Sequence, residues 1–127
     1  MTTYLAYIRS GRELSIAEEV APRVDDIWIA RQVTLEKQPG RKRLVPVVRP
    51  LITGVAFLTA TDEQWQDLRV KPIKHMRCTT QTLGRGDERQ LAAFRAHHDK
   101  QFEADMKLVE NASRSELVKF KKDQKLR

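Results

Sequence analysis

The sequence predicts an α+β domain with a mainly antiparallel β-sheet flanked by helices, followed by a C-terminal helical extension. Three observations lead to this fold class. Apolar residues that alternate on both sides of a Pro-Gly turn, within residues 33–58, are typical of antiparallel strands. Apolar residues at helical spacing predict two short helices, one over residues 13–20 and one after residue 61. A longer helical pattern follows residue 86.

The beginning of the chain is expected to alternate strand and helix. Tyr4–Ile8 combines apolar residues with β-formers and predicts the first strand. Gly11 marks a turn into a helix over Glu13–Val20, which Pro22 should end. Asp26–Leu35, where apolar and polar residues partly alternate, predicts a single strand.

The middle of the chain predicts a hairpin. Lys37–Arg43 is expected to form its turn, because it contains Pro-Gly beside a run of bases. Leu44–Val48 and Gly54–Thr59 are the next two expected strands. A short hinge is expected after Arg49-Pro50, before the second of these strands.

A second helix and a last strand complete the expected domain, residues 1–86. Thr61 or Asp62 is a candidate N-cap, and the acids Asp62 and Glu63 favour a helix N-terminus. Trp65 and Leu68 are spaced to lie on the buried face of this helix. Ile73–Thr80 returns to strand character, which gives the order βαβββαβ.

Residues 87–127 are expected to be a helical, basic C-terminal extension. The apolar stripe predicts one long helix that packs on the sheet or on a partner helix, and Ala112-Ser113 should break it. A partner-helix role would make the chain chiefly a scaffold. The tail Lys119–Arg127 is strongly basic, and nucleic acid is one candidate for its partner. The stripe comprises Leu91, Phe94, His98, Phe102, Met106 and Val109.

Positive charge is concentrated in a few places. The formal net charge is +7, and residues 37–49 contain no acid. Clustered bases attract polyanions, whereas the alternative is a solvated surface that like charges keep soluble. The bases within 37–49 are Lys37, Arg41, Lys42, Arg43 and Arg49.

The sequence lacks the patterns of several other protein classes. No apolar run approaches the roughly 20 residues that span a bilayer, and the N-terminus lacks the pattern of a secretory leader. One cysteine, Cys78, suits a reducing cytoplasm and is expected to be a small, buried or half-buried strand residue. We therefore expect a cytoplasmic protein.

Catalytic and metal-binding patterns are scarce. The sequence contains no nucleophile elbow, no phosphate-binding glycine loop and no zinc-spaced Cys/His set. His97 and His98 are adjacent on a helical pattern, so their side chains point in different directions and do not predict a metal site. The sequence predicts no enzyme, no metal and no cofactor.

Five segments in order resemble the N-terminal domain of the NusG family of transcription elongation factors, and within it the RfaH paralogue. The resemblance covers roughly residues 4–95, and the segment 49–58 is similar to the family's "RPLFPGYVFV" signature. The similar segments are Tyr4–Ile8, Arg9–Arg12, Val33–Arg43, Arg49–Leu58 and Trp65–Arg69.

The resemblance implies a non-catalytic elongation or antitermination factor that binds bacterial RNA polymerase. Domains of this family bind the clamp helices of the polymerase's largest subunit through an apolar, aromatic patch on one face of the sheet. The alternative is that these residues lie in the core. Those at the matching positions are Tyr7, Ile52, Val55 and Phe57.

The resemblance also implies contacts with upstream or non-template DNA. Basic side chains at the start of the first helix and at the hairpin tip would neutralise phosphates, which carries little sequence information. A stand-alone nucleic-acid-binding module is the alternative, although only 6% of the residues are aromatic. The implied residues are Arg9, Arg12, Arg41, Lys42 and Arg43.

The chain also departs from the family. Ile52-Thr53-Gly54-Val55 stands where the signature reads Phe-Pro-Gly-Tyr, so two aromatic side chains of the expected patch are missing. Residues 87–127 lack the strand pattern of the family's KOW barrel, so contacts with Rho or the ribosome are not expected. These features would suit a phage or mobile-element factor, and an inhibitor of host polymerase would use the same contacts as an activator.

Overall fold

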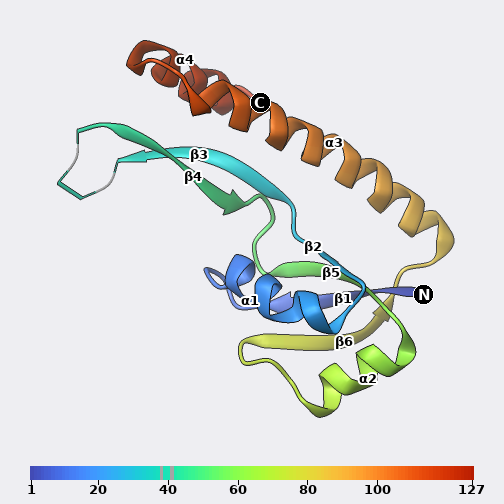
Figure 1. Cartoon of the computed structure of the whole chain (residues 1–127). Helices are drawn as coiled ribbons and strands as arrows, with labels where there is room; N and C mark the ends of the chain where they lie inside the picture. Colours follow the sequence, from blue (N-terminus) through green and yellow to red (C-terminus); the bar gives the residue numbers. More distant parts are fainter. Residues whose placement is uncertain (38, 41) are drawn as a thin grey trace. The chain divides into compact units, whose positions relative to one another are not determined.

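The structure, a computed structural model, describes residues 1–37, 39–40 and 42–127 (Figure 1). The chain forms two compact units, and each is built from two stretches of chain. Unit 1 contains Met1–Ala30 and Pro50–Arg95, and unit 2 contains Arg31–Arg49 and Ala96–Arg127. The α+β fold class is confirmed, whereas the domain boundary after residue 86 stays a prediction.

A four-stranded antiparallel sheet forms the centre of unit 1, with the strand order β2-β5-β1-β6. In the central pair, Leu5 lies opposite Phe57 and Tyr7 opposite Val55. The strands are β1 (Thr2–Ile8), β2 (Asp26–Trp28), β5 (Val55–Ala60) and β6 (Met76–Thr82).

One face of this sheet carries the main core. Successive strand residues point to opposite faces, and every second residue of β1 and β5 is buried. Helices α1 (Glu13–Val20) and α2 (Asp62–Val70) contribute apolar side chains to the same core. The bounds of α1 match the prediction. The core includes Ala6, Ala56, Leu58, Ile16, Val20, Trp65 and Leu68.

The start of α2 confirms the predicted N-cap. The Thr61 hydroxyl accepts a hydrogen bond from the Gln64 N–H (3.2 Å), and the Gln64 side chain accepts one from the Thr61 N–H (2.9 Å), which is a capping box. Trp65 is buried, as predicted, and its ring stacks on Tyr4 at 4.2 Å. The Tyr4 hydroxyl donates to Asp62 (3.0 Å), and burial raises the pKa of Tyr4.

The single strand expected over Asp26–Leu35 is wrong. The segment forms β2 and β3 (Arg31–Lys37), and these strands belong to different units. Trp28, Ile29 and Ala30 are consecutive buried residues, so no two-residue alternation continues through them. The Ala30 carbonyl accepts from the Leu51 N–H (2.7 Å) instead of joining a strand ladder.

Unit 2 packs a two-stranded sheet against helical segments. The sheet consists of β3 and β4 (Leu44–Pro50), and the helical segments come from α3 (Arg85–Glu110) and α4 (Arg114–Lys125). The break between the helices confirms the prediction, and Ser113 caps α4 through its hydroxyl. The core comprises Val33, Leu35, Val109, Leu117 and Phe120.

The predicted apolar stripe of α3 is only partly confirmed. Val109 is buried, but Met106 is 38% exposed, and the buried residue in that turn is Asp105. Asp105 is tolerated there because its carboxylate accepts hydrogen bonds from Gln101 (3.0 Å) and from the Arg127 guanidinium (2.8 and 3.1 Å). A buried acid whose partner lies 22 residues away cannot be foreseen from helical periodicity.

Candidate functional site

The second face of the unit 1 sheet holds three of the four predicted polymerase-binding residues. Tyr7, Val55 and Phe57 alternate with the buried residues of β1 and β5, so their side chains leave the sheet on the side opposite the core. Leu5 joins them through its pairing with Phe57. We call these four residues the open face. Tyr7 is 38% exposed and the other three are half-buried.

Arg77 borders the open face beside Tyr7. It lies opposite Tyr7 in the pairing of β1 with β6, and its guanidinium carbon is 5.1 Å from the centre of the Tyr7 ring. This cation–π contact orients the ring at the surface. Arg77 was not among the predicted site residues, because the pairing partner of Tyr7 is not readable from local sequence.

The Phe57 end of the open face is partly covered. The Phe57 ring lies 6.3 Å from the ring of Trp28, which in turn meets Phe94 of α3 edge-on at 5.9 Å. Arg95 of the same helix pairs with Asp26. The accessible part of the face is therefore centred on Tyr7 rather than on Phe57. Trp28 was also absent from the predicted site.

Ile52, the fourth predicted polymerase-binding residue, lies outside the strands. It is 42% exposed in the segment between β4 and β5, next to the exposed Leu51. Gly54 ends this segment with a φ of +80°, a value that favours glycine. Its carbonyl accepts from the Ile8 N–H (2.9 Å), which ties the loop to the end of β1.

The predicted DNA-facing residues Arg9 and Arg12 lie together in the loop between β1 and α1. The Arg12 N–H donates to the Arg9 carbonyl (3.0 Å), and the Arg9 N–H donates to the His75 carbonyl (2.9 Å). Both arginine side chains are exposed. This loop therefore lies against the segment that precedes β6.

Positive charge accumulates where these two loops meet. The pKa of His75 is lowered, first by desolvation and then by the charges of Arg9, Lys74 and Arg12. We call these four residues the loop cluster. A group of cations that disfavours protonation of a neighbouring imidazole is also a place that attracts an anion.

Glu13 is a buried residue that sequence reasoning missed as part of the site. It is only 1% exposed, and its carboxylate accepts from the N–H groups of Gly11 (2.6 Å) and Gly54 (3.2 Å). It therefore joins the loop that carries Arg9 and Arg12 to the loop that carries Ile52. A glutamate at a helix start ordinarily indicates only a favourable interaction with the helix dipole.

The predicted nucleic-acid-binding residues of the hairpin belong to unit 2. Lys42 and Arg43 are exposed and immediately precede β4. Arg41 lies outside the described residues. The predicted nucleic-acid residues are thus divided between the two units, with Arg9 and Arg12 in unit 1.

Other candidate chemistries find little support in the part of the chain that the structure describes. Its His, Cys, Asp and Glu side chains form no group of three that could hold a metal ion. Cys78 is half-buried in β6, as predicted, and burial raises the pKa of its thiol, which disfavours the reactive thiolate. None of the described helices combines the length and apolar character needed to cross a membrane.

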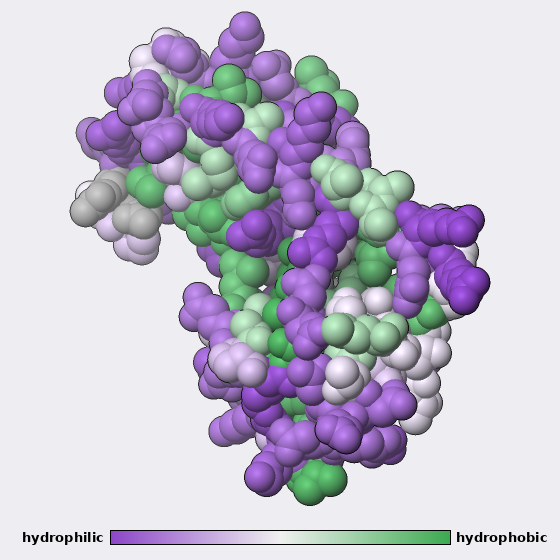
Figure 2. Space-filling view, turned by 45° about the vertical axis from the view of Figure 1, so that its right-hand side comes forward, coloured by the Kyte–Doolittle hydropathy of each residue, from purple (hydrophilic) through white to green (hydrophobic). Residues whose placement is uncertain are grey.

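Hydrophobic residues that remain at the surface are set among hydrophilic ones. On the face drawn in Figure 2, hydrophobic residues gather in patches that hydrophilic residues surround.

Comparisons of the chain with protein-family models, with curated proteins and with solved structures found no match.

Proposed function

We propose that this chain is a non-catalytic transcription elongation or antitermination factor that binds the clamp helices of bacterial RNA polymerase and nearby nucleic acid. The observation that carries the proposal is the common face of Tyr7, Val55 and Phe57, three residues named from the resemblance to the NusG family. The register pairs Tyr7 directly with Val55, so two of the three are neighbours.

The chemistry of the open face suits a partner helix. Tyr7 offers an aromatic anchor at the surface, and the half-buried Leu5 and Val55 provide apolar contact area beside it. Arg77 adds a cation at the border of the face. An apolar strip with a charged border is the usual form of a site that receives an amphipathic helix.

The loop cluster supports the nucleic-acid part of the proposal. Arg9 and Arg12 are exposed, and Lys74 and His75 bring further cationic or hydrogen-bonding side chains beside them. Such a cluster would contact phosphates without reading bases. Polymerase and DNA would then be bound by neighbouring parts of unit 1.

The test is a binding assay between the whole chain and purified bacterial core RNA polymerase. We expect the Tyr7→Ala/Val55→Ala variant to bind at least about tenfold more weakly, because truncated aromatic anchors commonly cost 2 kcal/mol or more. NusG should compete with the wild-type chain for the same site. Wild-type chain that fails to bind at moderate salt would refute the proposal.

A matched control separates loss of contact from loss of fold. Val70→Ala deletes the same two methyl groups as Val55→Ala, but from the end of α2, where Val70 is 76% exposed and outside the open face. This variant should bind as the wild type does. Equal weakening by Val70→Ala would place the polymerase contact elsewhere, and circular dichroism would check that all variants are folded.

A stand-alone nucleic-acid-binding module is the second candidate, and the loop cluster is the observation that favours it. This function requires tight binding to naked duplex DNA without polymerase. Affinity no better than the ordinary non-specific range, about 10⁻⁴–10⁻⁶ M at physiological salt, would argue against it.

Once polymerase binding is established, a transcription assay distinguishes an elongation factor from an inhibitor.

A further inference from the structure

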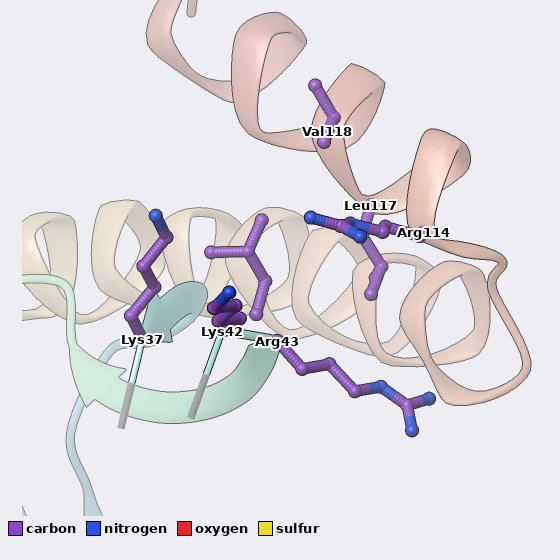
Figure 3. A pocket seen from close by; sticks show the side chains of 7 residues that line it. Lys37, Lys42, Arg43, Arg114, Leu117 and Val118 are labelled. Atoms are coloured by element: carbon purple, nitrogen blue, oxygen red, sulfur yellow. The ribbon is translucent and has the colours of Figure 1, made fainter. Parts of the chain in front are cut away.

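A basic cavity lies in unit 2 between the hairpin and α4 (Figure 3). Its volume is about 170 Å³, and four of the side chains that line it are cationic while none is acidic. Leu44, Leu117 and Val118 provide its apolar wall. The four cations are Lys37, Lys42, Arg43 and Arg114.

The four cations come from both sides of the cavity. In Figure 3, Lys37 and Lys42 extend from the hairpin and Arg114 from α4, whereas the guanidinium of Arg43 turns away from the others. Within the described ranges, no ion pair joins any of the four to an acid.

The two nearest acids in the sequence already have other partners. Glu36 accepts hydrogen bonds from the Arg49 guanidinium (2.7 and 2.9 Å), and Glu116 accepts one from the Ser113 hydroxyl (2.9 Å). Neither carboxylate lines the cavity. The positive charge of the cavity is therefore available to an anion from outside.

Three cations of α4 lie on one side of the helix, and its two acids lie on the opposite side. At about 100° per residue, Lys121 and Lys125 lie within roughly 20° of Arg114 around the helix axis. Glu116 and Asp123 lie roughly 160–180° away from Arg114 by the same geometry. The side that borders the cavity thus continues as a row of cations along the helix, over a rise of about 16 Å from Arg114 to Lys125.

Arg114 stands at an unfavourable place for helix stability. It is the first residue of α4, where the helix dipole favours acids rather than bases. A cation at this end does not stabilise the helix, but its side chain lines the cavity.

We propose that the cavity and the cationic row of α4 form a track for the phosphate backbone of single-stranded nucleic acid. The proposal rests on the proposed function only for the choice of nucleic acid, and it adds Lys37, Arg114, Lys121 and Lys125 to the hairpin residues Lys42 and Arg43. The track consists of cations spread along the hairpin and about 16 Å of α4 rather than one enclosed pocket, which suits a polyanion better than a free phosphate.

The apolar wall selects single-stranded nucleic acid as the occupant. A single strand exposes base surfaces that pack against Leu44, Leu117 and Val118 while its phosphates meet the cations. The backbone of a duplex presents only phosphates and sugars, and the apolar wall would then lose its partner. The cavity lining contains no aromatic residue, so binding should depend strongly on salt and little on sequence.

The test measures fluorescence anisotropy of a labelled, mixed-sequence single strand of about 20 nucleotides with the whole chain across a range of salt concentrations. We expect Arg114→Gln/Lys121→Gln to weaken binding at low salt about tenfold. The slope of log affinity against log salt should fall by about 1.4, since each lost phosphate contact removes about 0.7. No polymerase is present, so failure of the polymerase proposal would not affect this result.

The matched control is Lys100→Gln/Lys119→Gln, which removes the same charge from exposed positions of unit 2 that do not line the cavity. In this control, the slope of log affinity against log salt should change by less than half of the change expected for Arg114→Gln/Lys121→Gln. Equal changes in the two variants would overturn the proposal, since they would reflect net charge alone. Equally tight binding of a duplex or of polyglutamate at the same salt would also overturn it.

Discussion

At the scale of single residues, Glu13 joins the two loops that flank the open face. Its buried carboxylate accepts from the backbone of Gly11 and Gly54, and both glycines have positive φ values (+89° and +80°). Residues that carry a side chain rarely adopt such backbone angles. These loop conformations therefore depend both on the two glycines and on the Glu13 carboxylate that accepts their N–H groups. Arg9, Arg12 and Ile52 are positioned by this arrangement.

Glu13→Gln tests this role. The amide retains one oxygen acceptor and brings a buried NH₂ group close to two backbone N–H donors, so we expect a loss of about 1–3 kcal/mol of unfolding free energy. Urea unfolding measures this loss. Glu18→Gln, at an exposed position of the same helix, should change stability by less than about 0.5 kcal/mol. Equal effects of the two substitutions would refute the role.

The Glu36–Arg49 pair gives a residue-scale prediction about pH. Hydrogen bonds from Arg49 and then from Thr34 lower the pKa of Glu36 from 4.5 to about 2. Because the folded pKa is depressed, the stabilisation is present above pH 4.5 and is lost as the pH falls toward 2. In an NMR titration, Arg49→Gln should return the Glu36 pKa toward 4.5. An unchanged pKa would exclude Arg49 as its main cause.

At the scale of elements, the sequence predicted correctly those helix ends that depend on residues close to them in the chain. The bounds of α1 and the cap of α2 follow from residues within one or two helical turns, and both predictions are confirmed. The division of Asp26–Leu35 into β2 and β3 depends on which unit each half joins, and Asp105 depends on Arg127. Such long-range partners leave no periodic signal in the sequence.

In the candidate site, too, features set by nearby residues could be predicted and features set by long-range pairing could not. The aromatic and β-branched residues of β1 and β5 were identifiable as strand residues, but alternation predicted that some of the four patch residues would lie in the core, and none belongs to the core of unit 1. Which strands pair, and in what register, decides that Tyr7 meets both Val55 and Arg77. For the same reason, Trp28 and Glu13 were recognisable only once the chain was folded.

The cap of α2 offers an element-scale prediction. Thr61→Ala removes the hydroxyl acceptor for the Gln64 N–H and should cost about 1 kcal/mol of unfolding free energy. Denaturant unfolding measures this cost. Thr53→Ala, in the exposed segment before β5, should cost less than half as much. Comparable losses would show that the capping box contributes little.

At the scale of the whole molecule, the described residues form two hydrophobic cores with no residue in common. Val20 belongs to the core of unit 1 and Val33 to that of unit 2, and both are fully buried. Helix α3 begins in unit 1 and ends in unit 2, so it belongs to both. Truncation of a side chain in one core should therefore lower the stability of that core without changing the packing of the other.

Val20→Ala and Val33→Ala test the independence of the two cores. Each substitution should cost about 2 kcal/mol, since it deletes two buried methyl groups and leaves a small cavity. The cost of the double variant in chemical denaturation should equal the sum of the two within about 0.5 kcal/mol. A larger coupling energy would show that the two sites interact and that the cores are not independent.

The interleaved order of the two units has a consequence for biosynthesis. The ribosome makes β3 and β4 before it makes any of the helical residues 96–127 that cover Val33 and Leu35. An isolated two-stranded ribbon is barely stable in water. At roughly 5–20 residues per second, the nascent ribbon would wait several seconds for its cover, with apolar side chains open to chaperones or to neighbouring nascent chains.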